Sequence, residues 1–152
     1  MIETSCLLFV VDTLEYLRKG GRIGLAAAFI GGLLNVKPIL GLSKGLVCSL
    51  ERVRGTRNVQ NRFIALVGEY VAAHPNQEIR AAVTWARDSE NLEAMIPGLN
   101  QHVNCSQALR TEIGAVVGAH VGPGTVGISL NCLPAKLHGP LNPIIKQEAN
   151  HA

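Results

Sequence analysis

The spacing of apolar and polar residues changes several times along the chain, and these changes predict alternating strands and helices. Strands are expected at short apolar or alternating runs, namely Cys6–Val11, Lys37–Leu42, Leu46–Val53, Glu78–Ala86, Ala108–Ile113 and Thr125–Leu130. The second and third runs flank the turn Ser43-Lys44-Gly45 and are typical of a hairpin. Together the runs predict a sheet of mixed strand direction, mostly antiparallel.

Two longer segments have the spacing of amphipathic helices. Apolar residues recur on one side of residues 57–73, with Thr56 in place to cap the first turn. Ser89 is in place to cap a second helix of about residues 90–101. The apolar segment 115–120 fits either a helix or a strand. With the strands above, these helices predict a two-layer α/β (α+β) domain whose helices pack chiefly on one face of the sheet.

The segment Ile23–Leu34 is apolar on nearly all sides and contains three glycines. A helix without a polar face must be buried on most of its sides, and this one is too short to cross a membrane. We expect either a buried core helix or the wall of an apolar tunnel. A short helix should precede it, beginning near Asp12, whose carboxylate would accept hydrogen bonds from first-turn amides, and ending at Gly20-Gly21.

Composition limits the classes of protein to which the chain could belong. It has 152 residues, of which 47% are hydrophobic and 16% are charged, and a net charge of +3. These values suit one domain with an apolar core and do not indicate nucleic-acid binding. Its four cysteines lack the spacing of a zinc site or a disulfide framework, so we expect reduced thiols and a cytoplasmic protein. No signal peptide and no membrane span are predicted.

Basic side chains gather at two turns. Arg18, Lys19 and Arg22 bracket the pair Gly20-Gly21 before an apolar segment, an arrangement that suits an anion. The alternative is an ordinary helix end, where basic residues offset the helix dipole and the glycines form a turn. A second basic corner contains Arg52, Arg54 and Arg57. It is either a solvated edge or a docking patch for an acidic partner or a phosphate.

The histidine at position 120 leads into the turn Gly122-Pro123-Gly124. A lone histidine in such a place is more often a hydrogen-bonded core residue than a catalytic group. No serine or cysteine elbow and no second metal ligand stands at the spacing that catalysis or a metal site requires. Nucleotide-binding glycine motifs are absent as well. We therefore expect no catalytic residue, no metal and no cofactor.

Four stretches together resemble the DegV family of bacterial lipid-binding proteins. They are Thr13-Leu14-x-x-Leu17-x-Lys19-Gly20-Gly21-Arg22-Ile23, Leu34-Asn35-Val36-Lys37-Pro38-Ile39-Leu40, Val53-Arg54-Gly55 and His120-x-Gly122-Pro123-Gly124. The resemblance covers about residues 7–130. It implies a DegV-like carboxy-terminal lipid-binding domain at 1–131, and we expect residues 132–152 to form a poorly ordered tail.

The resemblance also implies a function and a set of site residues. Family members have two domains that hold one long-chain fatty acid in a tunnel between them, and an acyl kinase phosphorylates the bound acid. Carried over to this chain, the head group would lie near Arg22 and His120. The rest of the predicted site consists of Gly21, Gly122, Pro123 and Gly124 in the two turns and Ile23, Phe29, Ile30 and Leu33 in the tunnel wall. Arg54, with Arg52 beside it, would face the kinase.

The family's amino-terminal domain has no counterpart in this sequence. The resemblance therefore implies a carrier half-domain, and not an enzyme, that acts with a separate amino-terminal domain or as a homo-oligomer. An alternative is a truncated interaction or oligomerisation domain without ligand binding. A third interpretation is small-molecule phosphorylation, because distant relatives of the fold phosphorylate dihydroxyacetone, but the missing nucleotide motif counts against it.

Overall fold

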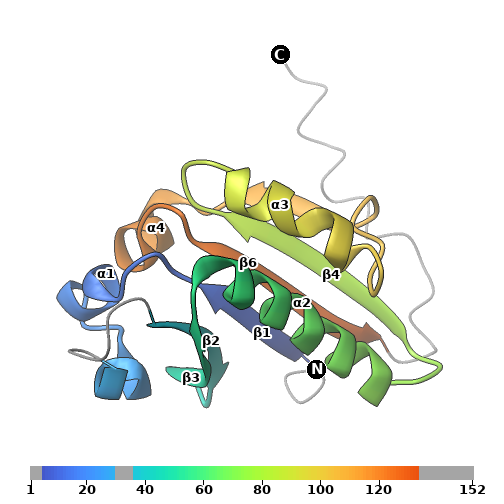
Figure 1. Cartoon of the computed structure of the whole chain (residues 1–152), viewed down its shortest axis with the longest axis horizontal. Coiled ribbons are helices and arrows are strands. Elements are labelled where there is room, and N and C mark those ends of the chain that lie inside the picture. Colours follow the sequence, from blue (N-terminus) through green and yellow to red (C-terminus); the bar gives the residue numbers. More distant parts are fainter. Residues whose placement is uncertain (1–4, 30–35, 134–152) are drawn as a thin grey trace, which may run out of the picture.

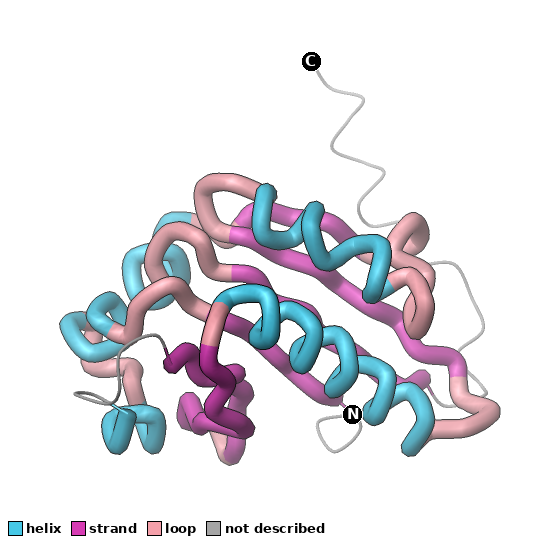
Figure 2. The backbone as a smooth tube through the Cα atoms, viewed as in Figure 1, coloured by secondary structure: helices cyan, strands magenta, loops and turns pink. Residues whose placement is uncertain are grey.

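The computed structural model describes residues 5–29 and 36–133, which build one mixed sheet with helices on both faces (Figures 1 and 2). The strand order is β3-β2-β1-β6-β4-β5, with β1 (Ser5–Val10), β2 (Val36–Ser43), β3 (Leu46–Arg54), β4 (Glu78–Trp85), β5 (Leu109–Glu112) and β6 (Val126–Leu133). Neighbouring strands are antiparallel except β4 and β5, which are parallel. The predicted fold class is confirmed.

The two longest helices, α2 (Thr56–Ala73) and α3 (Glu90–Leu99), lie on the same face of the sheet (Figure 1). Each buries one apolar side, as the sequence spacing predicted. The main core forms between these helices and the sheet, and its fully buried members include Phe63, Val67, Leu92, Met95, Leu99, Ile39, Val83, Ile128 and Leu130. Burying such side chains is worth about 1.5–3 kcal/mol each, so this layer is the main source of stability.

The opposite face carries only short helices in the part of the chain that the structure describes. They are α1 (Glu15–Lys19), the 3₁₀ helix η2 (Gly24–Phe29) and α4 (Ala115–Val121), gathered at one end of the sheet (left in Figure 1). A smaller apolar cluster lies there, formed by Phe9, Val11, Leu17, Ala26, Leu40, Val47 and Val121. Successive strand residues point to opposite faces, so Leu8 joins the main core whereas Phe9 joins this cluster.

The hairpin between β2 and β3 has the geometry that the sequence predicted. Its two turn residues, Lys44 and Gly45, have φ values of 51° and 80°. Two successive residues with positive φ match the right-handed twist of the flanking strands, which is why tight hairpins favour glycine at such positions. Lys44 is the less usual member of the pair, because a side chain disfavours this region.

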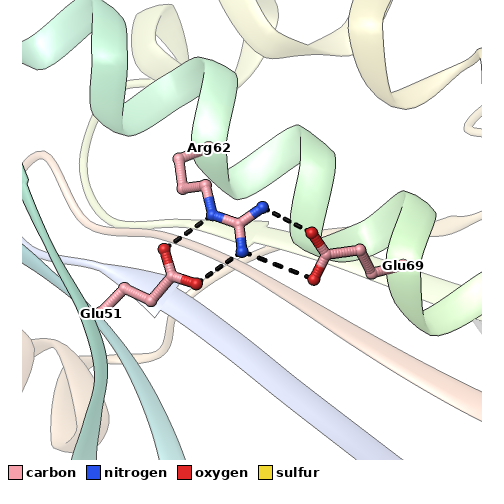
Figure 3. Close-up of polar contacts among 3 residues, drawn as sticks. All are labelled: Glu51, Arg62 and Glu69. Carbon is pink, nitrogen blue, oxygen red and sulfur yellow. Dashed lines mark hydrogen bonds and ion pairs between the residues drawn. The ribbon is translucent and has the colours of Figure 1, made fainter.

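An ion-paired arginine joins α2 to the edge strand β3 (Figure 3). Arg62 on the helix donates to both carboxylate oxygens of Glu51, over 2.6 Å and 2.5 Å, and its Nη1 donates to Glu69 over 2.6 Å. The hydrogen bonds from Arg62 lower the pKa of the Glu51 carboxyl, because they favour its charged form. The group therefore ties the start of the helical layer to the edge of the sheet.

The buried helix predicted for Ile23–Leu34 is wrong over its described part. Residues 24–29 form a 3₁₀ helix in which Leu25 is 64% exposed and Ala26 is buried. The segment begins at Gly24, which has a φ of +53° and lies so close to β3 that an added Cβ would stand 2.5 Å from the carbonyl oxygen of Val47. Glycine at that approach favours a tight turn against the strand over a regular helix. Residues 30–34 lie outside the described part of the chain.

The predicted side-chain caps are also wrong. Asp12 accepts a hydrogen bond from Lys37 Nζ over 3.1 Å, and Thr13 Oγ1 instead accepts one from the amide of Glu15 over 3.2 Å. An ion pair to the neighbouring strand has thus taken the carboxylate that could have capped α1. Thr56 is itself the first residue of α2, and neither its predecessor Gly55 nor Ser89 before α3 makes a side-chain cap hydrogen bond.

The last strand ends three residues later than the run predicted for it. Strand β6 continues through Cys132 and Leu133, because these residues still pair with β4. The remainder of the predicted tail, 134–152, lies outside the described residues. Cys105 and Cys132 are buried, Cys6 and Cys48 are half-buried, and all four are free thiols. Over the described ranges, no helix is long and apolar enough to cross a bilayer.

Candidate ligand site

A cavity of about 530 Å³ lies on the sheet face opposite α2 and α3. Most of its lining is apolar and comes from strands, from α1, from α4 and from the link between β5 and α4, namely Leu7, Phe9, Leu42, Val47, Leu17, Ile113, Val117 and Val121. The volume falls within the range of roughly 300–1,000 Å³ that is usual for small-molecule sites. An apolar cavity of this size suits a ligand that is mostly hydrocarbon.

The floor of the cavity follows from the alternation of residues in the central strands. Leu7 and Phe9 of β1 point into it, whereas Leu8 between them packs under the helices. In the adjacent strand β6, Gly127 pairs with Phe9 on one side and with Thr84 on the other. Because Gly127 carries no side chain, its neighbours approach it closely, and an added Cβ would stand only 3.1 Å from Cγ2 of Thr84.

Arg22 and His120 both line this cavity, although they lie far apart in the sequence. Arg22 follows the double-glycine turn after α1, and its amide donates to the Leu17 carbonyl over 2.8 Å. Its Nη1 lies 3.5 Å from the carbonyl oxygen of Gly20. His120 belongs to α4, at the other side of that turn. A guanidinium and an imidazole at the wall of an apolar cavity provide polar contacts for an acidic head group.

One ring nitrogen of His120, Nδ1, is buried without a hydrogen-bond partner in the part of the chain that the structure describes. The sequence had left open that this histidine is an ordinary hydrogen-bonded core residue, and the structure does not show such a bond at Nδ1. Leaving a buried polar atom without a partner costs about 1–3 kcal/mol, so the position of the ring calls for another explanation.

The turn after His120 is packed against the loop at the start of α1. A Cβ added to Gly122, which has a φ of +79°, would overlap the ring of Tyr16, and one added to Gly124 would overlap the carboxylate of Asp12. Thr125 closes the turn, with Oγ1 donating toward the carbonyls of Val121 and Gly122 over 3.0 Å and 2.9 Å. The two glycine motifs therefore interlock, and each loop leaves space for side chains of the other.

Most of the other predicted ligand residues do not line the cavity. Gly21, Gly122, Pro123 and Gly124 shape the two turns behind it, and Ile23 packs beside the smaller apolar cluster. Of the tunnel-wall residues, Ile30 and Leu33 lie outside the described part of the chain, as does the side chain of Phe29. Arg52 and Arg54 are exposed on β3, away from the lining.

Several lining residues were missed from the sequence, above all Leu7 and Phe9. A signal for them was present, because the run Cys6–Val11 is apolar at every position. A strand that is apolar on both faces requires both faces to be covered. The long helices cover only one face here, so the second set of apolar residues could have been assigned to a ligand or a partner.

Apolar surface continues outward from the cavity. Leu42 and Val117, which line it, are 51% and 55% exposed, and Val116, which precedes Val117 in α4, is 79% exposed. Contiguous exposed apolar surface marks sites of ligand or partner binding. No group of three or more potential metal ligands occurs among residues 5–29 and 36–133.

Curated proteins resemble this chain over most of its length. A DegV domain-containing protein of Deinococcus radiodurans is 38% identical over 129 residues, which cover 85% of this chain and 45% of that protein. Protein DegV of Bacillus subtilis is 35% identical over 128 residues, with 84% and 45% covered. The chain thus spans slightly less than half the length of the curated relatives that it matches.

Solved structures share the fold. A DegV family protein of Thermus thermophilus, described for its fatty acid binding, superposes with a TM-score of 0.74 at 36% identity, over 86% of this chain and 46% of that one. The fatty acid binding protein DegV of Bacillus subtilis gives a TM-score of 0.67 at 32% identity, over 88% and 46%. The family model described as "Uncharacterised protein, DegV family" matches residues 1–132. The chain belongs to the DegV family.

Proposed function

We propose that this chain is the lipid-binding half of a fatty-acid carrier. A long-chain fatty acid would lie with its acyl chain in the cavity and its carboxylate toward Arg22 and His120. The observation that carries the proposal is that one apolar cavity of about 530 Å³ includes both of these polar side chains in its lining. An acyl chain with a single charged end needs that combination.

The chemistry of the lining supports this ligand class. Transferring apolar surface out of water contributes about 25 cal/mol per Å², and the side chains of Leu7, Phe9 and Val117 offer such surface to an acyl chain. A guanidinium binds a carboxylate through charge-assisted hydrogen bonds, which are about twice as strong as neutral ones. The relatives from Thermus thermophilus and Bacillus subtilis, which are described as fatty acid binding, support the same assignment.

The exposed rim of the cavity supports a role as one half of the site. Val117 lines the cavity, and Val117 and its neighbour Val116 are both more than half exposed to solvent. The chain matches only 45% of the length of its Deinococcus relative. We infer that the family's amino-terminal domain covers this rim and completes the head-group site, and that the chain itself acts as a carrier and not as an enzyme.

The same exposed rim favours a second candidate, in which the chain forms homo-oligomers and binds no lipid. Burying Val116, Val117 and Leu42 in a contact between copies would also remove their apolar surface from water. Native mass spectrometry of the gently purified chain separates the two candidates. A bound mass equal to a long-chain fatty acid supports the carrier, whereas a ligand-free dimer supports the oligomer.

We further propose that an acyl kinase contacts β3 through Arg54 and Arg52. Val53 packs toward α2, so the residues on either side of it project from the face of the sheet that holds the cavity. Two exposed basic residues on that face could attract an acidic surface of the partner. A kinase docked there would approach the side of the molecule on which the head group is proposed to lie.

The carrier proposal is tested by titrating the chain with a fluorescent octadecanoic acid analogue. Replacing Arg22 by Ala should raise the Kd by about 10- to 150-fold, because a charge-assisted contact to the carboxylate is worth roughly 1.5–3 kcal/mol. Arg57→Ala is the matched control, since Arg57 is an exposed arginine of α2 and does not line the cavity. Equal affinity of the Arg22→Ala variant and the control would remove Arg22 from the site.

A further inference from the structure

The imidazole of His120 lies directly against the backbone of Gly20, which follows the last residue of α1. A Cβ built on Gly20 would overlap the ring, with Nδ1 as the nearest atom and Cε1 and Cγ at 2.9 Å and 3.2 Å. Real Cβ atoms do not approach other atoms so closely. The ring therefore occupies the space that any side chain at position 20 would need.

The backbone at Gly20 does not itself require glycine. Its φ is −77° and its ψ is −3°, values that any residue adopts. The next residue differs, because Gly21 has a φ of +65° and an added Cβ there would meet open space. The two glycines are therefore needed for different reasons. Gly21 adopts the positive φ of the turn, and Gly20 leaves the space that the His120 ring occupies.

The position of the ring is not explained by stability. Its Nδ1 is buried against Gly20 without a partner among the described residues, which is unfavourable. Unfavourable placements of this kind occur where a side chain serves a ligand. With Nδ1 covered, Nε2 is the nitrogen through which the ring can meet a molecule in the cavity that it lines.

Gly20 also contacts the second polar side chain of the site. Its carbonyl oxygen lies 3.5 Å from Nη1 of Arg22, while its Cα side faces the His120 ring. We propose that Gly20 is a positioning residue: its missing side chain fixes the imidazole beside the guanidinium, so that both meet one acidic head group. The part of this inference that concerns the ligand rests on the proposed function, whereas the placement of the ring is a separate claim.

The test compares Gly20→Ala with Gly118→Ala in the 152-residue chain. Gly118 is a matched control, because it lies in the same helix as His120 and an added Cβ would come no closer than 3.9 Å, to the carbonyl oxygen of Ile113. Gly20→Ala should shift the His120 ring signals in NMR spectra and weaken binding of the fluorescent fatty acid about tenfold, as loss of a head-group hydrogen bond would. Gly118→Ala should leave the affinity unchanged.

A second pair of variants separates positioning from a general structural effect. In a His120→Ala background the space beside Gly20 is empty, so adding Gly20→Ala should not change the Kd further. The inference would be overturned by unchanged ring signals in Gly20→Ala, or by an equal increase in Kd when Gly20→Ala is added to His120→Ala. If Gly20→Ala fails to fold but the double variant folds, the inference is supported. If neither variant folds, it is overturned. If the wild-type chain binds no fatty acid, the proposed function fails, and the ring signals still decide the role of Gly20.

Discussion

Single residues at the two glycine turns decide where the polar groups of the proposed site lie. Thr125 is the one polar residue among the described ones that is almost completely buried, at 1% exposure, and its hydroxyl reaches the carbonyls of Val121 and Gly122. These carbonyls belong to the end of α4, which lacks intrahelical partners for its last carbonyls. Thr125 therefore holds the end of the helix that carries His120.

Replacing Thr125 by Val should destabilise the chain by about 1–3 kcal/mol, because a methyl group cannot donate to carbonyls that remain buried. Thr125→Ser keeps the hydroxyl and should lose less. Urea unfolding of the two variants and the wild type measures the difference. Equal unfolding free energies for Val and Ser at this position would show that the hydroxyl contributes nothing.

The sequence identified the residues of the two turns, but it did not show that the two turns lie side by side in the fold. Arg22 and His120 were assigned to one site only through the family resemblance, because residues so far apart in the chain have no spacing rule that joins them. In the sequence, Gly20 indicates only a turn, because the His120 ring that lies against it belongs to another helix. Contacts between distant segments were the part that the sequence could not supply.

At the scale of elements, strands and long helices were predicted well because each repeats a period over many residues. The helix at 57–73 and the strand at 78–86 differ from the structure by one residue at most. The failures occurred where tertiary contacts compete with local preference. Asp12 pairs with Lys37 and does not cap α1, and Gly24 packs on β3 and begins a 3₁₀ helix.

The link between α2 and β3 gives the stability a specific pH dependence. Arg62 lowers the pKa of Glu51 in the folded chain, so the stabilisation is present above the unfolded carboxyl pKa of about 4.3 and is lost as the pH falls through the lower, folded value. Arg62→Met should flatten the decrease in unfolding free energy between about pH 5 and pH 3.

Urea unfolding at several pH values checks this expectation, with Arg57→Met as a control on the same helix. The control should retain the slope of the wild type, because Glu51 keeps its partner. A residual slope is expected in every variant, since Arg18 lowers the pKa of Glu15 by a separate hydrogen bond. Identical slopes for wild type and Arg62→Met would contradict the role assigned to this ion pair.

At the scale of the whole molecule, the two faces of the sheet differ in how they are covered. One face is closed by α2 and α3 and contains most of the buried core. The other carries short helices at one end and leaves a cavity over β1 and β6, with apolar side chains exposed at its rim. The closed side contains the core that keeps the domain folded, and the open face is the one to which we assign the proposed ligand and the proposed covering domain.

Photolabelling tests this division of faces most directly. A long-chain fatty acid with a diazirine on its acyl chain would be bound to the chain, irradiated, and the labelled peptides located by mass spectrometry. We expect labels near Leu7, Phe9 and Val117, and their loss when unlabelled fatty acid competes. Labels concentrated on α2 and α3, or labelling that competition does not reduce, would contradict the proposal that the open face binds the acyl chain.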